Sequence, residues 1–205
     1  LTLRQRMNLS AVAGKASTWA KGPTPETHSA WKTALTIAEK LDDKEIRLQA
    51  HYGLWLYYLR TGELDKALEH AQSMCELARS ITDEEAMATG LRILGVSLHF
   101  LGRHDVGRDY LQQSLDWYEH GELSHSFRFG LDQESAGQAF LSRLLWLQGE
   151  YKAAKQMAWR GVKKAARLQH VCSLCCALAE GACMTAALDR NPRWVIKAAN
   201  WLIHL

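Results

Sequence analysis

The apolar and polar positions of this chain follow the pattern of helices joined by short turns. Three segments, LWLYYLRTGELDKALEHA, LRILGVSLHFLGRHDVGRDYL and LSRLLWLQGEYKAAKQMA, align on a glycine. Each segment is typical of a helix, a glycine turn and a second helix. No stretch alternates apolar and polar residues for long, as a half-buried strand would. The pattern therefore predicts an all-α chain without a sheet.

The three aligned glycines share a repeating neighbourhood. The aligned glycines are Gly62, Gly102 and Gly149. Because glycine tolerates positive φ, we expect each of them to end the first helix of its segment. Two residues later stand Leu64, His104 and Tyr151, and five residues later the small residues Ala67, Gly107 and Ala154. This order is typical of the tetratricopeptide repeat, and the segment with His104 fits it only loosely. The glycines are 40 and 47 residues apart, against roughly 34 in the standard repeat, so we expect longer helices or linkers.

Helix-start signals divide the chain into pairs. Thr24 followed by Pro25, and Asn191 followed by Pro192, are typical of an N-cap and a first helical residue. Asp42 with Glu45, and Thr82 with Glu85, have the spacing of a capping box. We expect a tetratricopeptide-like α-solenoid, a right-handed superhelix of about five antiparallel helix pairs near residues 2–40, 44–80, 84–119, 132–168 and 170–205.

Composition is that of a soluble chain with a buried core. Hydrophobic residues make up 47% and charged residues 23% of the 205 residues, which favours one continuous helical-repeat domain over residues 1–205. The first residue is not Met, and Leu205 stops inside the apolar helical pattern WVIKAANWLIHL. We expect a fragment of a larger multidomain protein. Since we find neither a signal peptide nor an apolar run of roughly 18 residues, we expect a cytoplasmic protein without membrane contact.

Charge and cysteines add little specific chemistry. The formal net charge of +3 is spread along the chain and by itself argues little for or against a nucleic-acid partner; we expect no direct nucleic-acid binding. The densest basic run, Arg160, Lys163, Lys164 and Arg167, is interpreted as a solvated helix face. Four cysteines in HVCSLCCALAEGACM are expected to be reduced, mostly buried and free of metal, because structural zinc needs about four ligands from separate segments.

No enzyme motif is found. The chain lacks a phosphate-binding loop, a dinucleotide fingerprint, an HExxH string and a GxSxG elbow. The irregular segment from His120 to Asp132 contains His120, Glu122 and His125, which are possible metal ligands without a second segment to complete a site. We therefore expect no catalytic residue, no metal and no cofactor in this chain.

Several strings resemble a known family: KGPTPET, YGLWLYYLRTGELDKALEHAQSM, LGVSLHFLGRHDVGRDYLQQSLDWY and FRFGLDQESAGQAFLSRLLWLQGEYKAA. They are similar to the C-terminal helical-repeat region of large bacterial signal-transduction ATPases, whose N-terminal domains are nucleotide cyclases or winged-helix DNA-binding domains. The resemblance covers most of residues 1–205. It implies a sensor or autoinhibitory arm without catalytic residues of its own, which binds a protein or ligand and relays this to the ATPase.

The repeat register suggests where binding would occur. In a tetratricopeptide stack the first helix of each pair lines the concave face, and arginine and aromatic residues dominate binding energy at interfaces. Exposed concave positions counted from the glycines are Tyr52, Arg92, His99, Arg143 and Trp146. The tryptophans Trp55, Trp146 and Trp159 are also interpreted as packing residues. We expect this face to bind a protein or peptide, and possible partners include the upstream domains of the same chain. The alternative is a repeat domain that senses a small molecule and controls an attached ATPase, cyclase or DNA-binding domain.

Overall fold

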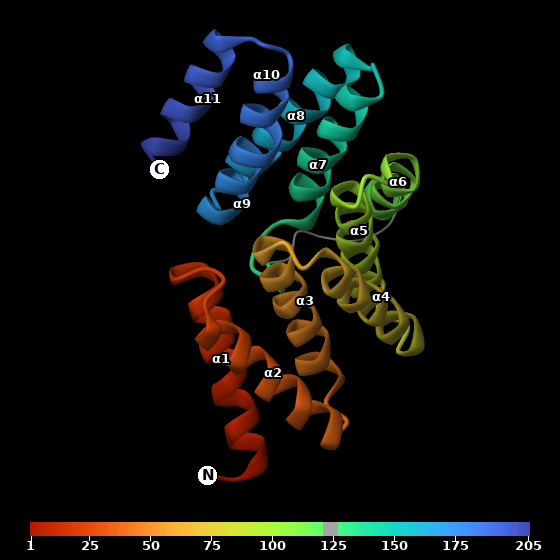
Figure 1. The fold of residues 1–205 in the computed structure, drawn as a ribbon, viewed down its shortest axis with the longest axis vertical. Coiled ribbons are helices and arrows are strands. Elements are labelled where there is room, and N and C mark those ends of the chain that lie inside the picture. Colours follow the sequence, from red (N-terminus) through yellow and green to blue (C-terminus); the bar gives the residue numbers. More distant parts are fainter. Residues whose placement is uncertain (121–126) are drawn as a thin grey trace. The chain divides into compact units, whose positions relative to one another are not determined.

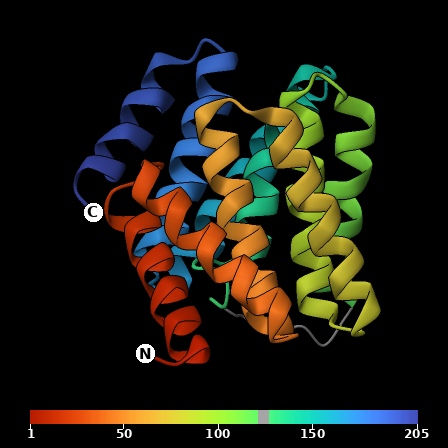
Figure 2. The same ribbon diagram turned by 60° about the horizontal axis from the view of Figure 1, so that its bottom comes forward.

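The computed structural model describes residues 1–120 and 127–205, and these residues form helices and turns without a strand. The tetratricopeptide-like, all-α fold expected from the sequence is confirmed, with helix pairs at the expected places (Figures 1 and 2). The chain divides into two compact units, Leu1–Leu101 and Gly102–Leu205.

The first unit contains five antiparallel helices. Each packs against the next in sequence, and α1 with α3 and α3 with α5 are also in contact, as expected of stacked pairs. The helices are α1 (Leu3–Ala20), α2 (Pro25–Lys40), α3 (Lys44–Thr61), α4 (Leu64–Ser80) and α5 (Glu84–Phe100).

A buried tryptophan on α2 sets how closely α1 and α3 pack against that helix. Trp31 on α2 is 4% exposed, and its indole N–H donates to Thr18 Oγ1 at 2.9 Å. A Cβ added to Gly14 of α1 or Gly53 of α3 would come within 2.7 and 2.2 Å of the Trp31 ring. These two glycines therefore let both neighbouring helices lie directly against the indole.

The second unit contains the second helix of one pair, α6, and two complete helix pairs. The first helix of the last pair is continuous from α9 through the π-helix η1 to α10 (Figure 1). The bounds are α6 (His104–His120), α7 (Gln133–Leu147), α8 (Tyr151–Arg167), α9 (Val171–Cys176), η1 (Ala177–Cys183), α10 (Met184–Leu188) and α11 (Pro192–Ile203). The core of this unit gathers Val162, Ala165, Leu174, Ala177, Leu178, Ala182 and Ala198.

The turns confirm the glycine register. Gly62, Gly102 and Gly149 have φ of 81°, 76° and 87°, and the positions five residues later, Ala67, Gly107 and Ala154, are buried. Small residues there allow the second helix of a pair to pack closely on its neighbours.

Two of the four predicted helix starts need correction. Thr24 and Asn191 cap α2 and α11 as expected. The expected caps Asp42 and Thr82 are wrong by one residue, because both take positive φ in the preceding turn. The carboxylates of Asp43 and Asp83 accept instead from the backbone N–H groups of Ile46 and Ala86, which is the geometry of an N-cap.

The end of the irregular segment is well packed. The backbone N–H of Asp132 donates to Ser173 Oγ at 2.7 Å, and the Phe127 ring stacks on His170 with centroids 4.0 Å apart. These contacts connect the start of α7 with the start of α9. The possible metal ligands Glu122 and His125 lie outside the described residues, as does the side chain of His120.

The cysteine-rich helix is less buried than expected. All five cysteines are free thiols; Cys75 is buried, whereas Cys172, Cys175, Cys176 and Cys183 are only half-buried. Within the described part of the chain no group of three or more His, Cys, Asp or Glu side chains is arranged to hold a metal ion. Val171–Leu188 is long and apolar enough to cross a membrane, contrary to the sequence reading, but 44% of it is buried inside the protein, where η1 packs on α7, α8 and α11.

Candidate binding groove

Three of the five predicted binding residues are buried, so the expectation of exposure is wrong for them. Tyr52, Arg92 and His99 are 5%, 2% and 6% exposed. The Arg92 guanidinium donates to Tyr52 Oη at 3.3 Å and lies 5.3 Å from the centre of the Trp55 ring. Arg92 and His99 lie on α5, which is buried along nearly its whole length, on every side rather than along one stripe. Tyr52 lies in a run of consecutive buried residues on α3.

The other two predicted residues are half-buried in the second unit. Arg143 donates to Glu180 Oε2 at 2.9 Å, and burial lowers the pKa of Arg143 while Glu180 opposes this shift. The Trp146 ring lies 5.3 Å from that of Tyr151. The buried indole N–H of Trp146 has no hydrogen-bond partner among the described residues. Arg143 is thus held by an acid, and neither residue lines the open groove found elsewhere in this unit.

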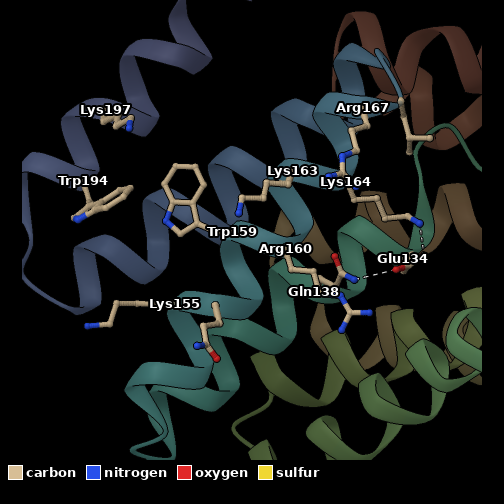
Figure 3. A pocket seen from close by; sticks show the side chains of 12 residues that line it. Glu134, Gln138, Lys155, Trp159, Arg160, Lys163, Lys164, Arg167, Trp194 and Lys197 are labelled. Carbon is tan, nitrogen blue, oxygen red and sulfur yellow. Dashed lines mark hydrogen bonds and ion pairs between the residues drawn. The ribbon is translucent and has the colours of Figure 1, made fainter.

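That groove lies over α7, α8 and α11 and has a volume of about 1000 Å³ (Figure 3). Most of its lining comes from the second helices of the last two pairs, whereas the sequence reading placed binding on first helices. We call it the basic groove. It is lined by Glu134, Gln138, Lys155, Gln156, Trp159, Arg160, Lys163, Lys164, Arg167, Leu168, Trp194 and Lys197.

Helix α8 provides the groove's cationic side because it is strongly amphipathic. Its buried face consists of small residues, Ala154, Ala158, Gly161, Val162 and Ala165. A Cβ added to Gly161 would meet the backbone oxygen of Ser135 at 3.1 Å, so α8 lies close against α7. The long cationic side chains of α8 stand outside this tightly packed face and line the groove.

Half of the six cationic side chains in the groove are held by acids. Lys164 pairs with Glu134 at 2.5 Å (Figure 3). Outside the groove lining, Glu119 holds Arg160 at 2.6 Å and Asp189 holds Lys155 at 3.1 Å. Among the described side chains, no acid lies within ion-pair distance of the remaining three, Lys163, Arg167 and Lys197. The groove therefore presents a surplus of positive charge to a ligand.

One buried acceptor in the groove lacks a partner. Gln138 is 1% exposed, and its amide nitrogen donates to Glu134 Oε1 at 3.0 Å (Figure 3). Its Oε1 has no hydrogen-bond donor among the described residues. A buried acceptor without a donor costs free energy, so a ligand N–H that reached this oxygen would be stabilised.

Two tryptophans form the other end of the groove. The rings of Trp159 on α8 and Trp194 on α11 are 5.0 Å apart at an angle of 60°, and Lys197 Nζ lies 5.2 Å from the Trp194 ring centre (Figure 3). Trp159 also packs on the core of the second unit. The interpretation of Trp159 as a packing residue was thus incomplete. The basic run beside it, which was interpreted as a solvated helix face, lines the same groove.

A sequence signal for this groove exists. Trp159, Arg160, Lys163, Lys164 and Arg167 recur at spacings of one, three and four residues, which places an aromatic ring and four cations along one side of a helix. The contribution of Trp194 and Lys197, more than thirty residues later, could only come from the packing of α11.

Comparison with known proteins identifies the fold. RapI in its apo form superposes with a TM-score of 0.76 at 14% identity, over 98% of this chain and 69% of RapI. BtubC (BKLC) from P. vanneervenii gives a TM-score of 0.63 at 14% identity, over all of this chain and 91% of that one. A signal transduction ATPase with numerous domains (STAND) from Pyrococcus horikoshii, described with a tetratricopeptide repeat sensor, gives 0.64 at 17% identity, over all of this chain and 30% of that protein.

These similarities show a tetratricopeptide-like repeat fold for this chain. No protein-family model matches the sequence, and no curated protein matches it either. The likeness to a STAND repeat sensor agrees with the family resemblance at the level of the repeat region.

Proposed function

We propose that this chain is a non-catalytic recognition arm of a bacterial, cytoplasmic signal-transduction regulator, and that it binds an acidic protein segment in the basic groove. The observation that carries the proposal is the surplus of cationic side chains beside two tryptophans on one continuous surface. Carboxylates are attracted to such a surface, and arginine and tryptophan supply much of the binding energy where they are buried by a partner.

A protein segment suits this groove better than a nucleic acid does. The free acceptor is Gln138 Oε1, and a peptide carries one N–H donor on almost every residue, whereas a nucleic-acid backbone of phosphates offers acceptors. The formal net charge of +3 is also mild for a nucleic-acid binder.

The regulatory role rests on the sequence resemblance and on the repeat sensor of the STAND neighbour. In this arrangement the arm holds an acidic segment, and its occupancy controls an attached ATPase, cyclase or DNA-binding domain. One source of the segment is the upstream module of the same chain, so that the arm would restrain that module until a signal competes for the groove.

The test is fluorescence anisotropy with a short fluorescein-labelled peptide of Glu, Asp and Ala residues. Lys163→Glu combined with Arg167→Glu should lower the affinity by about tenfold or more, because it reverses two charges that lack acidic partners. Lys15→Glu with Lys152→Glu is the matched control, since both lysines are exposed and neither lines the groove.

Equal affinities of the two double variants would reject the groove as the binding site. A single-stranded oligonucleotide that binds more tightly than the peptide, and loses binding in the groove variant, would overturn the protein partner in favour of nucleic acid. Hydrolytic or transferase activity of the chain itself would reject the non-catalytic role.

A further inference from the structure

A second and smaller pocket adjoins the basic groove. It has a volume of about 140 Å³ and shares Lys155, Trp159 and Trp194 with the groove. Its remaining lining comes from α8, η1, α10 and the start of α11, namely Ala158, Ala182, Thr185, Ala186, Asp189 and Asn191. A ligand in the groove would therefore lie next to this pocket.

The deeper lining of the pocket is apolar. Ala158, Ala182 and Ala186 are 2%, 4% and 8% exposed, and the indole rings of Trp159 and Trp194 stand closer to solvent, with Trp194 42% exposed. An apolar cavity of roughly this volume is large enough to bind a benzene molecule. The space accordingly fits a single leucine or phenylalanine side chain.

The polar groups around the pocket are already engaged. Asp189 accepts from Lys155 Nζ through both carboxylate oxygens, at 3.1 and 3.2 Å, and Thr185 Oγ1 lies 3.0 Å from Ser142 Oγ. The side chain of Asn191 caps α11 by accepting from the backbone N–H of Trp194. A charged group inside the pocket would lose its hydration without gaining a free partner, so the favoured occupant is apolar.

The helix geometry explains why the space exists. A Cβ added to Gly181 would lie 3.1 Å from Ala139 Cβ, so η1 packs directly on α7. Ala182 and Ala186 follow at a spacing of four residues and face Ala158 of α8 across the pocket. Because these three side chains end at Cβ, the space between α8, η1 and α11 is not filled from within the chain.

We propose that the acidic segment carries one apolar anchor side chain, leucine or phenylalanine, which inserts beside Trp159 and Trp194 while its carboxylates contact the cations of α8. This inference rests on the proposed function, since it assigns a specificity pocket to the same groove. The proposed partner is then an acidic segment that buries a single apolar residue. Interfaces commonly combine a buried hydrophobic anchor with a polar rim in this way.

The first test uses the unaltered protein and two peptides. Both are the acidic anisotropy probe described above, one with a central leucine and the other with alanine at that position. The leucine peptide should bind about tenfold more tightly, because burial of a leucine side chain is favourable. Equal affinities for the two peptides would overturn the anchor and leave the acidic-segment proposal standing, whereas no binding of either peptide would overturn both.

The second test fills the pocket. Ala186→Leu should abolish the difference between the two peptides while the alanine peptide binds as before. Ala187→Leu is the control, because Ala187 is exposed on the same helix and does not line the pocket. A leucine preference that survives Ala186→Leu in a folded protein, as judged by circular dichroism, would place the anchor elsewhere; if that variant does not fold, the peptide pair still decides.

Discussion

Arg92 illustrates how burial at a single residue departs from what the repeat register suggests. Its guanidinium lies 5.8 and 5.3 Å from the ring centres of Tyr52 and Trp55, and Trp55 donates to Ser97 Oγ at 2.9 Å. A planar, delocalised cation suits a site between aromatic faces. Residues that would serve recognition if exposed therefore serve packing in this chain, and Arg92 is better regarded as part of the core.

The backbone conformation of the turn glycines predicts how substitutions there change the stability of the protein. Gly62 and Gly102 have positive φ, and an added Cβ would meet no atom within 4 Å at either position. Gly62→Val or Gly102→Val should lower the free energy of unfolding by about 1 to 3 kcal/mol through backbone strain alone. Urea denaturation measures this. Asn tolerates the left-handed region better, so Gly62→Asn should cost less than Gly62→Val; equal stability of the valine variants and the wild type would contradict the conformational argument.

At the scale of elements, the pairing of α3 with α4 brings two histidines together. His51 Nδ1 and His70 Nδ1 are 3.0 Å apart, and the Tyr58 ring stacks on His70 at an interplanar angle of 8°. Burial lowers the pKa of His51 to about 4, with additional contributions from His70 and Arg47. Burial also lowers the pKa of His70 to about 4, with His28 adding to the shift. Two adjacent protonated imidazoles are thus incompatible with this packing.

This pair predicts acid sensitivity of the α3–α4 contact. In the unfolded chain these histidines bind protons near pH 6.5, and in the folded chain near pH 4. Between these values the unfolded state binds more protons, so stability is complete above about pH 6.5 and is lost as the pH falls towards 4, by up to about 3 kcal/mol for each histidine. Denaturant unfolding at several pH values measures this.

The control isolates the two imidazoles from the carboxylates that also titrate in acid. His51→Phe with His70→Phe should have a weaker dependence of stability on pH over this range, while His204→Phe, at an exposed position near the end of the chain, should behave as the wild type does. The same dependence in the double variant and in the wild type would refute the assignment.

On the scale of the whole molecule, a chain with a mild net charge carries a locally cationic groove. The formal net charge is +3, whereas six cations gather around the basic groove of the second unit. Such local concentration directs an acidic partner to one surface without making the whole protein strongly basic.

Salt should consequently weaken acidic-peptide binding without unfolding the chain. Raising NaCl from about 50 to about 500 mM shortens the Debye length from above 10 Å to below 8 Å, so the affinity should fall by about tenfold or more while the helical circular dichroism is unchanged. The variant with Lys163→Glu and Arg167→Glu should show a smaller salt dependence. An affinity that does not change with salt would contradict a contribution of charge and would attribute the binding to apolar contacts.

The sequence by itself determined the elements, because their signals are local. A glycine with positive φ ends a helix at its own position, and a proline after Thr24 or Asn191 starts one within a residue. Even here the choice between Asp42 and Asp43 as the cap depended on a left-handed turn that the spacing does not reveal.

Only the tertiary structure decided which side chains are available for binding. The register placed Tyr52, Arg92 and His99 on exposed positions, but exposure depends on how many neighbours cover a helix. Helix α5 is covered almost completely, and the middle of α3 around Tyr52 is also buried. The basic groove likewise needs Trp194 and Lys197 of α11 beside α8, and the smaller pocket next to it needs three alanines from three helical segments around one space. Long-range packing sets both, because burial is a property of the surrounding elements and not of the residue's own segment.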